Sequence, residues 1–124
     1  MGAKTDDKRR HRRYDVPEHT YAALNSKFML VGKILNISKG GLAFIYVANG
    51  LKICNTFQVD IFFRGNGFCL KEVPFVTVSD FYIENKVPFS TVVIKQCGGQ
   101  FGELTHSQIS QIDYFIENHA ICND

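Results

Sequence analysis

The sequence lacks the features of a secreted or membrane-spanning protein. No apolar run in its 124 residues approaches the ~18–20 residues that a membrane-spanning helix needs. The basic N-terminus leads into the segment 14–18, which is not the apolar stretch of a signal peptide. Proline and glycine, at three and ten residues, are too few for a disordered or collagen-like chain. We therefore expect one globular domain in the cytoplasm, without membrane insertion.

The cysteines and histidines lack the spacing of a metal or redox site. No two of the four cysteines form a CxxC pair, and the four histidines form no HxH or HExxH pattern. We expect reduced, mostly buried thiols, histidines at the surface or at helix ends, and no metal or cofactor. A zinc ion held by four isolated cysteines is the alternative. The residues concerned are Cys54, Cys69, Cys97 and Cys122, and His11, His19, His106 and His119.

Motifs of the common enzyme classes are also missing. The chain has no GxSxG nucleophile turn, no phosphate-binding Walker loop and no zinc-hydrolase helix. The acidic residues of the expected strands and helix are scattered singly, without an evident pair placed for acid–base chemistry. We therefore do not expect an enzyme.

Positive charge is present, but it is concentrated near the N-terminus. Six of the fourteen basic residues, and only two of the twelve acidic residues, lie in 4–13. From Cys97 onward the chain has no Lys or Arg. We expect residues 1–13 to form a flexible basic arm that binds an anion or a nucleic acid, with a merely solvated tail as the alternative.

The rest of the chain has mainly the pattern of consecutive short strands. From Phe57 to Phe63, every second residue is apolar, which is the period of a half-buried strand. Similar apolar runs bounded by Gly, Asn or Ser predict further strands. The expected strands are 20–24, 28–35, 42–47, 57–63, 68–82 and 89–95, followed by an interruption at 97–99.

Only the end of the chain predicts a helix. Thr105 and Gln108 fit a capping box, in which the Thr side chain caps the first turn and the Gln reaches back. Apolar residues then recur at helical spacing on one face, at Ile109, Ile112, Phe115 and Ile116. The expected fold is mainly β, a small six-stranded antiparallel split β-barrel over 14–124 with a C-terminal amphipathic helix at about 105–119.

Two polar segments are candidates for a binding site, and the first is the arginine run 9–13. Arg9 and Arg13 would lie on the same side of an extended chain. Guanidinium groups bind phosphates through paired N–H donors, and they stack on bases or hydrogen-bond to their edges. A ligand with two phosphates and two bases could bridge the two arginines.

The second candidate is the segment 36–41 between two expected strands. Asn36 and Ser38 offer polar side chains to an anion or a base edge while they order the turn. Gly40 and Gly41 permit positive φ and a close backbone approach, so that their amides can face a ligand. An ordinary tight β-turn is the alternative.

Together, the two segments resemble the motifs of the PilZ domain family. An RxxxR motif from Arg9 to Arg13 is followed by an NxSxxG motif formed by Asn36, Ser38 and Gly41. The resemblance covers nearly the whole chain, because the small barrel, the segment 97–101 and the closing helix fall where that family has them.

The resemblance implies a bacterial receptor for cyclic di-GMP, a cyclic dinucleotide with two guanines and two phosphates. The two arginines of RxxxR would grip phosphate and guanine, and Arg10 inside the motif would supplement them. The Asn, Ser and Gly of NxSxxG would form the second side of the site. Whether one ligand or an intercalated pair binds stays open.

We expect the ligand to neutralise the like charges of the arm and to order it against the 36–41 turn. The reshaped surface would then bind a downstream protein that the sequence does not identify. A PilZ-fold adaptor that binds a protein without nucleotide is one alternative. A small-barrel binder of single-stranded nucleic acid is another. We favour it least, because the body of the domain is slightly acidic and has no aromatic-plus-basic stripe.

Overall fold

A computed structural model describes residues 11–25, 29–48, 53–65, 67–83 and 92–122. This part of the chain forms eight strands and one helix. Their bounds are β1 Tyr14–Asp15, β2 Thr20–Asn25, β3 Met29–Ile37, β4 Gly41–Val47, β5 Thr56–Phe63, β6 Phe68–Ile83, β7 Ile94–Phe101, α1 His106–His119 and β8 Ile121–Cys122.

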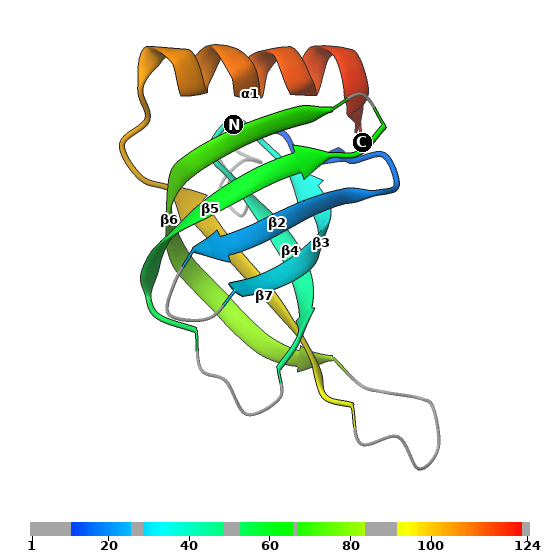
Figure 1. Cartoon of the computed structure of the whole chain (residues 1–124), viewed down its shortest axis with the longest axis vertical. Coiled ribbons are helices and arrows are strands. Elements are labelled where there is room, and N and C mark those ends of the chain that lie inside the picture. Colours follow the sequence, from blue (N-terminus) through cyan, green and yellow to red (C-terminus); the bar gives the residue numbers. More distant parts are fainter. Residues whose placement is uncertain (1–10, 26–28, 49–52, 66, 84–91, 123–124) are drawn as a thin grey trace, which may run out of the picture.

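Six of these strands close into an antiparallel barrel (Figure 1). The order β2–β5–β6–β7–β4–β3 returns on itself because β3 also pairs with β2. Each of the six pairings is antiparallel. The predicted fold class, a six-stranded antiparallel barrel with a C-terminal helix, is therefore confirmed.

Strand β7 corrects one sequence-based expectation. The break expected at 97–99 does not occur, because β7 runs through both glycines from Ile94 to Phe101. It pairs with β4 on one side and with β6 on the other along this length. Two flanking ladders hold the backbone extended and override the low strand propensity of glycine. Of the predicted strand 89–95, residues 89–91 lie outside the described residues.

The helix α1 covers one end of the barrel (Figure 1). Its capping box forms as predicted, since the Thr105 hydroxyl accepts from the Gln108 amide at 3.0 Å and the Gln108 side chain accepts from the Thr105 amide at 3.0 Å. The Gln108 side chain also donates to the carbonyls of Lys71 and Glu72, which ties the first turn to β6. Ile112, Phe115 and Ile116 are buried under the helix, whereas Ile109 is exposed.

Two short strands join the ends of the described chain, and no sequence pattern predicted them. In β1, Tyr14 lies opposite Ile37 and Asp15 opposite Asn36 of β3. Strand β8, directly after α1, pairs with the other side of β1. A two-residue strand is too short to show a period in sequence. The segment that follows the basic arm is thereby held between β3 and the tail of the helix.

The cysteines differ from the prediction. Cys97 is buried, but Cys54 and Cys69 are exposed, and the side chain of Cys122 is not among those described. Cys69 faces outward because its neighbour Leu70 faces the core and successive strand residues alternate. Within the described ranges, no three His, Cys, Asp or Glu residues gather to hold a metal, and no helix has the length and apolar character to cross a bilayer.

Candidate ligand-binding site

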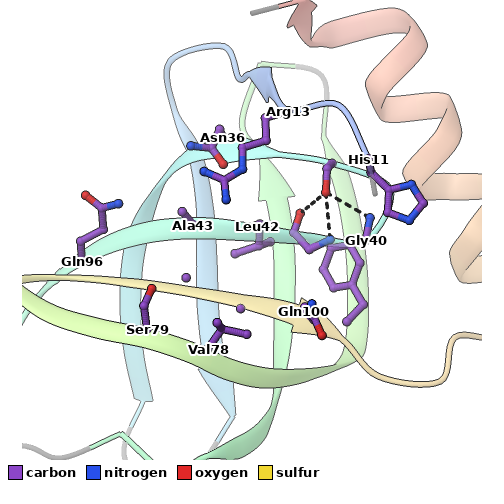
Figure 2. A pocket seen from close by; sticks show the side chains of 15 residues that line it. His11, Arg13, Asn36, Gly40, Leu42, Ala43, Val78, Ser79, Gln96 and Gln100 are labelled. Carbon is purple, nitrogen blue, oxygen red and sulfur yellow. Dashed lines mark hydrogen bonds between the residues drawn. The ribbon is translucent and has the colours of Figure 1, made fainter. Parts of the chain in front are cut away.

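A pocket of about 660 Å³ opens on the outer face of the barrel. Its floor is formed by neighbouring parts of β4, β7 and β6, and its rim by the end of β3 and by His11 and Arg13 (Figure 2). The segments that meet here are widely separated in sequence. Strand pairing brings them together, so the pocket is a product of the barrel topology.

Arg13 lies at the rim of this pocket, directly before β1. The pairing of Tyr14 with Ile37 places Arg13 next to the end of β3. Figure 2 shows its side chain beside Asn36, over the pocket. In the described part of the chain, no hydrogen bond or ion pair holds its guanidinium, which is exposed. Arg13 is thus positioned by the backbone and keeps its donors for an anion.

Asn36 reaches the pocket because β3 has a bulge. Ile34 pairs with Phe44 and both are buried, but the next pairing joins Asn36 to Ala43, with Leu35 as the extra residue. Without the bulge, Asn36 would share the core face with Ile34, two positions earlier. The bulge turns the half-buried Asn36 outward, onto the face that carries the pocket.

Ser38 orders the turn between β3 and β4. Its hydroxyl oxygen accepts hydrogen bonds from the amides of Gly40 and Gly41, each at 3.1 Å. The Ser38 amide donates to the Gly41 carbonyl at 2.8 Å. The two glycine amides are therefore engaged inside the turn, and the expectation that they face a ligand is wrong.

The two glycines of this turn also differ from the prediction in conformation. Neither has positive φ; among the described glycines, only Gly67 does. Gly41 is needed for space, because a Cβ atom there would collide with the Gly99 carbonyl of β7. A Cβ at Gly40 would meet the His11 ring, which packs across the turn. The small residues thus permit two close approaches, one of β7 and one of the segment before β1.

The charge of the pocket favours an anion. Among the described residues, its lining includes Arg13 and His11 and no carboxylate. The neighbouring Lys39 forms an exposed ion pair with Asp113 of α1 at 3.8 Å. Of the predicted site residues, Arg13, Asn36, Ser38 and Gly41 all line this one pocket. Arg9 and Arg10 lie outside the described residues.

Several residues that line the pocket were not predicted from the sequence. Ser79 and Val78 of β6 both reach the pocket because a second bulge lies between Thr77 and Ser79. Gln96 and Gln100 come from the outward face of β7. The sequence of β7 does contain a signal for the two glutamines. Gln96, Gly98 and Gln100 alternate with the buried Cys97, and this alternation indicates a polar strand face.

The chain folds into a small β-barrel with a pocket on its outer face, and solved structures show which fold this is. The chain is similar over 90% of its length to the PilZ domain of YcgR from Escherichia coli, solved with c-di-GMP, at 15% identity and a TM-score of 0.70, covering 90% of that chain. It is similar to MrkH of K. pneumonia in its c-di-GMP complex at 17% identity and a TM-score of 0.73, over 90% of this chain and 52% of that one. The inhibitor of motility MotI/DgrA of Bacillus subtilis aligns at 18% identity and a TM-score of 0.62, over 90% of this chain and 51% of that one.

The protein has the fold of a PilZ domain, as the sequence motifs predicted. It spans about half the length of MrkH and MotI/DgrA. No protein-family model and no curated protein sequence matches the chain.

Proposed function

We propose that this protein is a receptor for cyclic di-GMP, which binds in the pocket between the basic arm and the Ser38–Gly41 turn. The observation that carries the proposal is the convergence of Arg13, Asn36 and this turn on one pocket of a PilZ fold. The structures of YcgR and MrkH to which the fold is similar contain this dinucleotide. The role is binding rather than catalysis.

The chemistry of the pocket suits such a ligand. The Arg13 guanidinium offers a planar fork of donors to a phosphate, and charge-assisted hydrogen bonds of this kind are stronger than neutral ones. The Asn36 amide offers both a donor and an acceptor to a guanine edge. Since none of the described lining residues is a carboxylate, the two phosphates meet no repulsive charge from this part of the pocket.

Binding would also deliver the signal. We propose that Arg9 and Arg10 join Arg13 on the bound dinucleotide, so that the part of the arm before His11 becomes ordered across the pocket and creates a surface for a downstream protein. Backbone amide NMR tests this step, because residues 8–10 should lose mobility when cyclic di-GMP is added, whereas residues 11–13, which already lie against the β3–β4 turn, should change less. Unchanged relaxation of the amides of residues 8–10 in the saturated complex would contradict it.

Calorimetric titration of cyclic di-GMP into the full chain tests the receptor itself. We expect saturable binding, and a loss of about 10–150-fold in affinity for Arg13→Ala, because hydrogen bonds to a charged group contribute about 1.5–3 kcal/mol. Arg64→Ala is the matched control. Arg64 is an exposed arginine in the turn after β5 and does not line the pocket, so its loss changes the net charge equally. Its affinity should stay within about twofold of wild type.

Two further arms of the titration separate the alternatives. Cyclic di-AMP should bind more weakly than cyclic di-GMP if the pocket reads guanine. Single-stranded nucleic acid would show a steep salt dependence, since binding many phosphates releases many counterions. The absence of heat with cyclic di-GMP at protein concentrations suited to micromolar binding would refute the receptor. The PilZ-fold adaptor would then be favoured.

A further inference from the structure

Among the described glycines, Gly98 in β7 is the one for which packing and backbone conformation give the least reason to lack a side chain. A Cβ at its neighbour Gly99 would collide with the Val76 carbonyl and the Phe75 ring. A Cβ at Gly98 would meet only the Ser79 hydroxyl oxygen, at 3.1 Å, and the Ala43 side chain, at 4.0 Å. Ser79 is exposed and can rotate its hydroxyl away. The φ of Gly98 is not positive, so an L side chain would fit its backbone.

A glycine inside a strand lowers stability relative to alanine, and it often marks a place where a ligand comes close to the backbone. In the described part of the chain, no packing contact at Gly98 compensates for that loss of stability. The position instead faces the pocket, which lies on the outer side of β7. An external group that approaches the backbone there would account for the missing side chain.

The residues on either side of Gly98 are small as well. Ala43 of β4 and Ser79 of β6 are its direct partners in the two ladders. Adjacent strands lie ~4.8 Å apart, so these three residues form a side-chain-poor shelf about 10 Å wide across three strands. We call Ala43, Gly98 and Ser79 the shelf. Its width suits the flat face of a fused two-ring base.

Two side-chain amides of β7 flank the shelf, one on either side of Gly98. Gln96 and Gln100 lie two residues before and two residues after Gly98 on the same face, about 13 Å apart along the strand. Figure 2 shows them on opposite sides of the pocket floor. In the described part of the chain, neither side chain makes a hydrogen bond. An amide offers both a donor and an acceptor, as the edge of a purine does.

We propose that the shelf receives one guanine of the bound dinucleotide face-on, and that Gln96 and Gln100 hydrogen-bond to the edges of the ligand's bases. This inference rests on the proposed function. The shelf itself carries no cation, so it suits a base rather than a phosphate, whereas Arg13 at the rim suits a phosphate. The carbonyl oxygen of a Gln accepts from the guanine N1–H and exocyclic amine, and its NH₂ donates to O6. Adenine presents a different order of donors and acceptors.

Calorimetric titration with cyclic di-GMP and cyclic di-AMP tests the shelf in the full chain. Gly98→Ala should keep the wild-type melting temperature or raise it slightly, and should weaken cyclic di-GMP binding by about tenfold, because its methyl group lifts the base off the backbone. Gly98→Val should weaken binding further. Gln96→Ala combined with Gln100→Ala should reduce the preference for cyclic di-GMP over cyclic di-AMP by about tenfold or more. Gln58→Ala, an exposed glutamine of β5 outside the pocket, is the matched control and should change neither value.

The outcomes distinguish the shelf from the receptor. If wild type binds cyclic di-GMP and Arg13→Ala does not, but both Gly98 variants and the double Gln variant behave as wild type, the shelf is refuted and the receptor stands. If wild type does not bind, the receptor fails, and the shelf fails with it. Should Gly98→Val fail to fold, Gly98→Ala and the ratio of affinities in the Gln variants still decide the question.

Discussion

The inner and outer faces of the sheet segment β4–β7–β6 differ in what their polar groups do. Side chains alternate between the two faces, so residues that are adjacent in sequence point to opposite sides of the sheet. On the inner face, Tyr46 donates to Asp80 at 2.6 Å and Lys95 to the other oxygen of Asp80 at 2.9 Å. On the outer face, the side chains of Gln96 and Gln100 line the pocket and make no hydrogen bond in the described part of the chain.

The inner face therefore contributes to stability. Buried polar groups must be paired, and among the described residues no buried side-chain N or O atom lacks a partner. Burial and the hydrogen bond to Asp80 raise the pKa of the Tyr46 hydroxyl, and the hydrogen bond to Asp80 raises the pKa of Lys95. Lys95 also lies over the Tyr82 ring, 4.8 Å from its centroid.

The outer face has the opposite character. Its residues are small at the centre and polar at the ends, and their hydrogen-bonding groups are available to an external partner. Along β7, residues of the inner face therefore alternate with residues that line the pocket. Substitutions on the inner face should then change folding, and substitutions on the outer face should change binding.

The adjacent glycines of β7 offer the sharpest test, with the largest expected effect on stability. Gly99→Ala should lower the free energy of unfolding by about 3 kcal/mol, because the new methyl group meets the Val76 backbone and the Phe75 ring. Gly98→Ala, one residue away, should leave it unchanged or raise it slightly. Urea denaturation of both variants measures the contrast. Equal destabilisation by the two substitutions would break the distinction between the faces.

A smaller effect is expected from Asp80→Ala. It removes the acceptor of the buried Tyr46 hydroxyl, and an unpaired buried donor costs about 2 kcal/mol. Asp113→Ala is the control carboxylate, since its ion pair with Lys39 is exposed and contributes under about 1 kcal/mol. Denaturation midpoints at neutral pH compare the two. A loss from Asp113→Ala as large as that from Asp80→Ala would argue against a special role for the inner network.

The smallest and most specific effect is a dependence on alkaline pH. Burial raises the pKa of the Cys97 thiol from its ordinary value of 9.0 to about 11. A raised pKa in the folded state favours the protonated form, so this contribution to stability is complete below pH 9 and is lost as the pH rises from 9 through 11. Tyr46 and Lys95 add to the loss at higher pH, because their pKa values are raised in the same direction.

Urea midpoints measured from pH 8 to pH 11 should therefore fall above pH 9, and Cys97→Ala should make the first part of this fall shallower. The same burial should protect Cys97 from a thiol reagent in the folded protein, while the exposed Cys54 reacts. An unchanged fall in Cys97→Ala would contradict this account.

Much of the fold followed from local patterns. The capping box at Thr105 and Gln108 predicted the helix, and apolar alternation predicted β5. Apolar runs bounded by Gly, Asn or Ser predicted most of the other strands. The run through Gly98 and Gly99 was misjudged, because pairing on both sides outweighs the local preference of glycine. Strands β1 and β8 were missed, since two residues cannot show a period.

The sequence by itself determined the class of fold and the motif that contains Arg13, Asn36, Ser38 and Gly41, because period, capping and turn residues are local properties. The tertiary structure decided what the motif faces. Two bulges turn Asn36 and Ser79 outward, and ladder register sets Gly98 between Ala43 and Ser79. Register and bulges depend on which strands pair, which is settled only when the whole barrel closes.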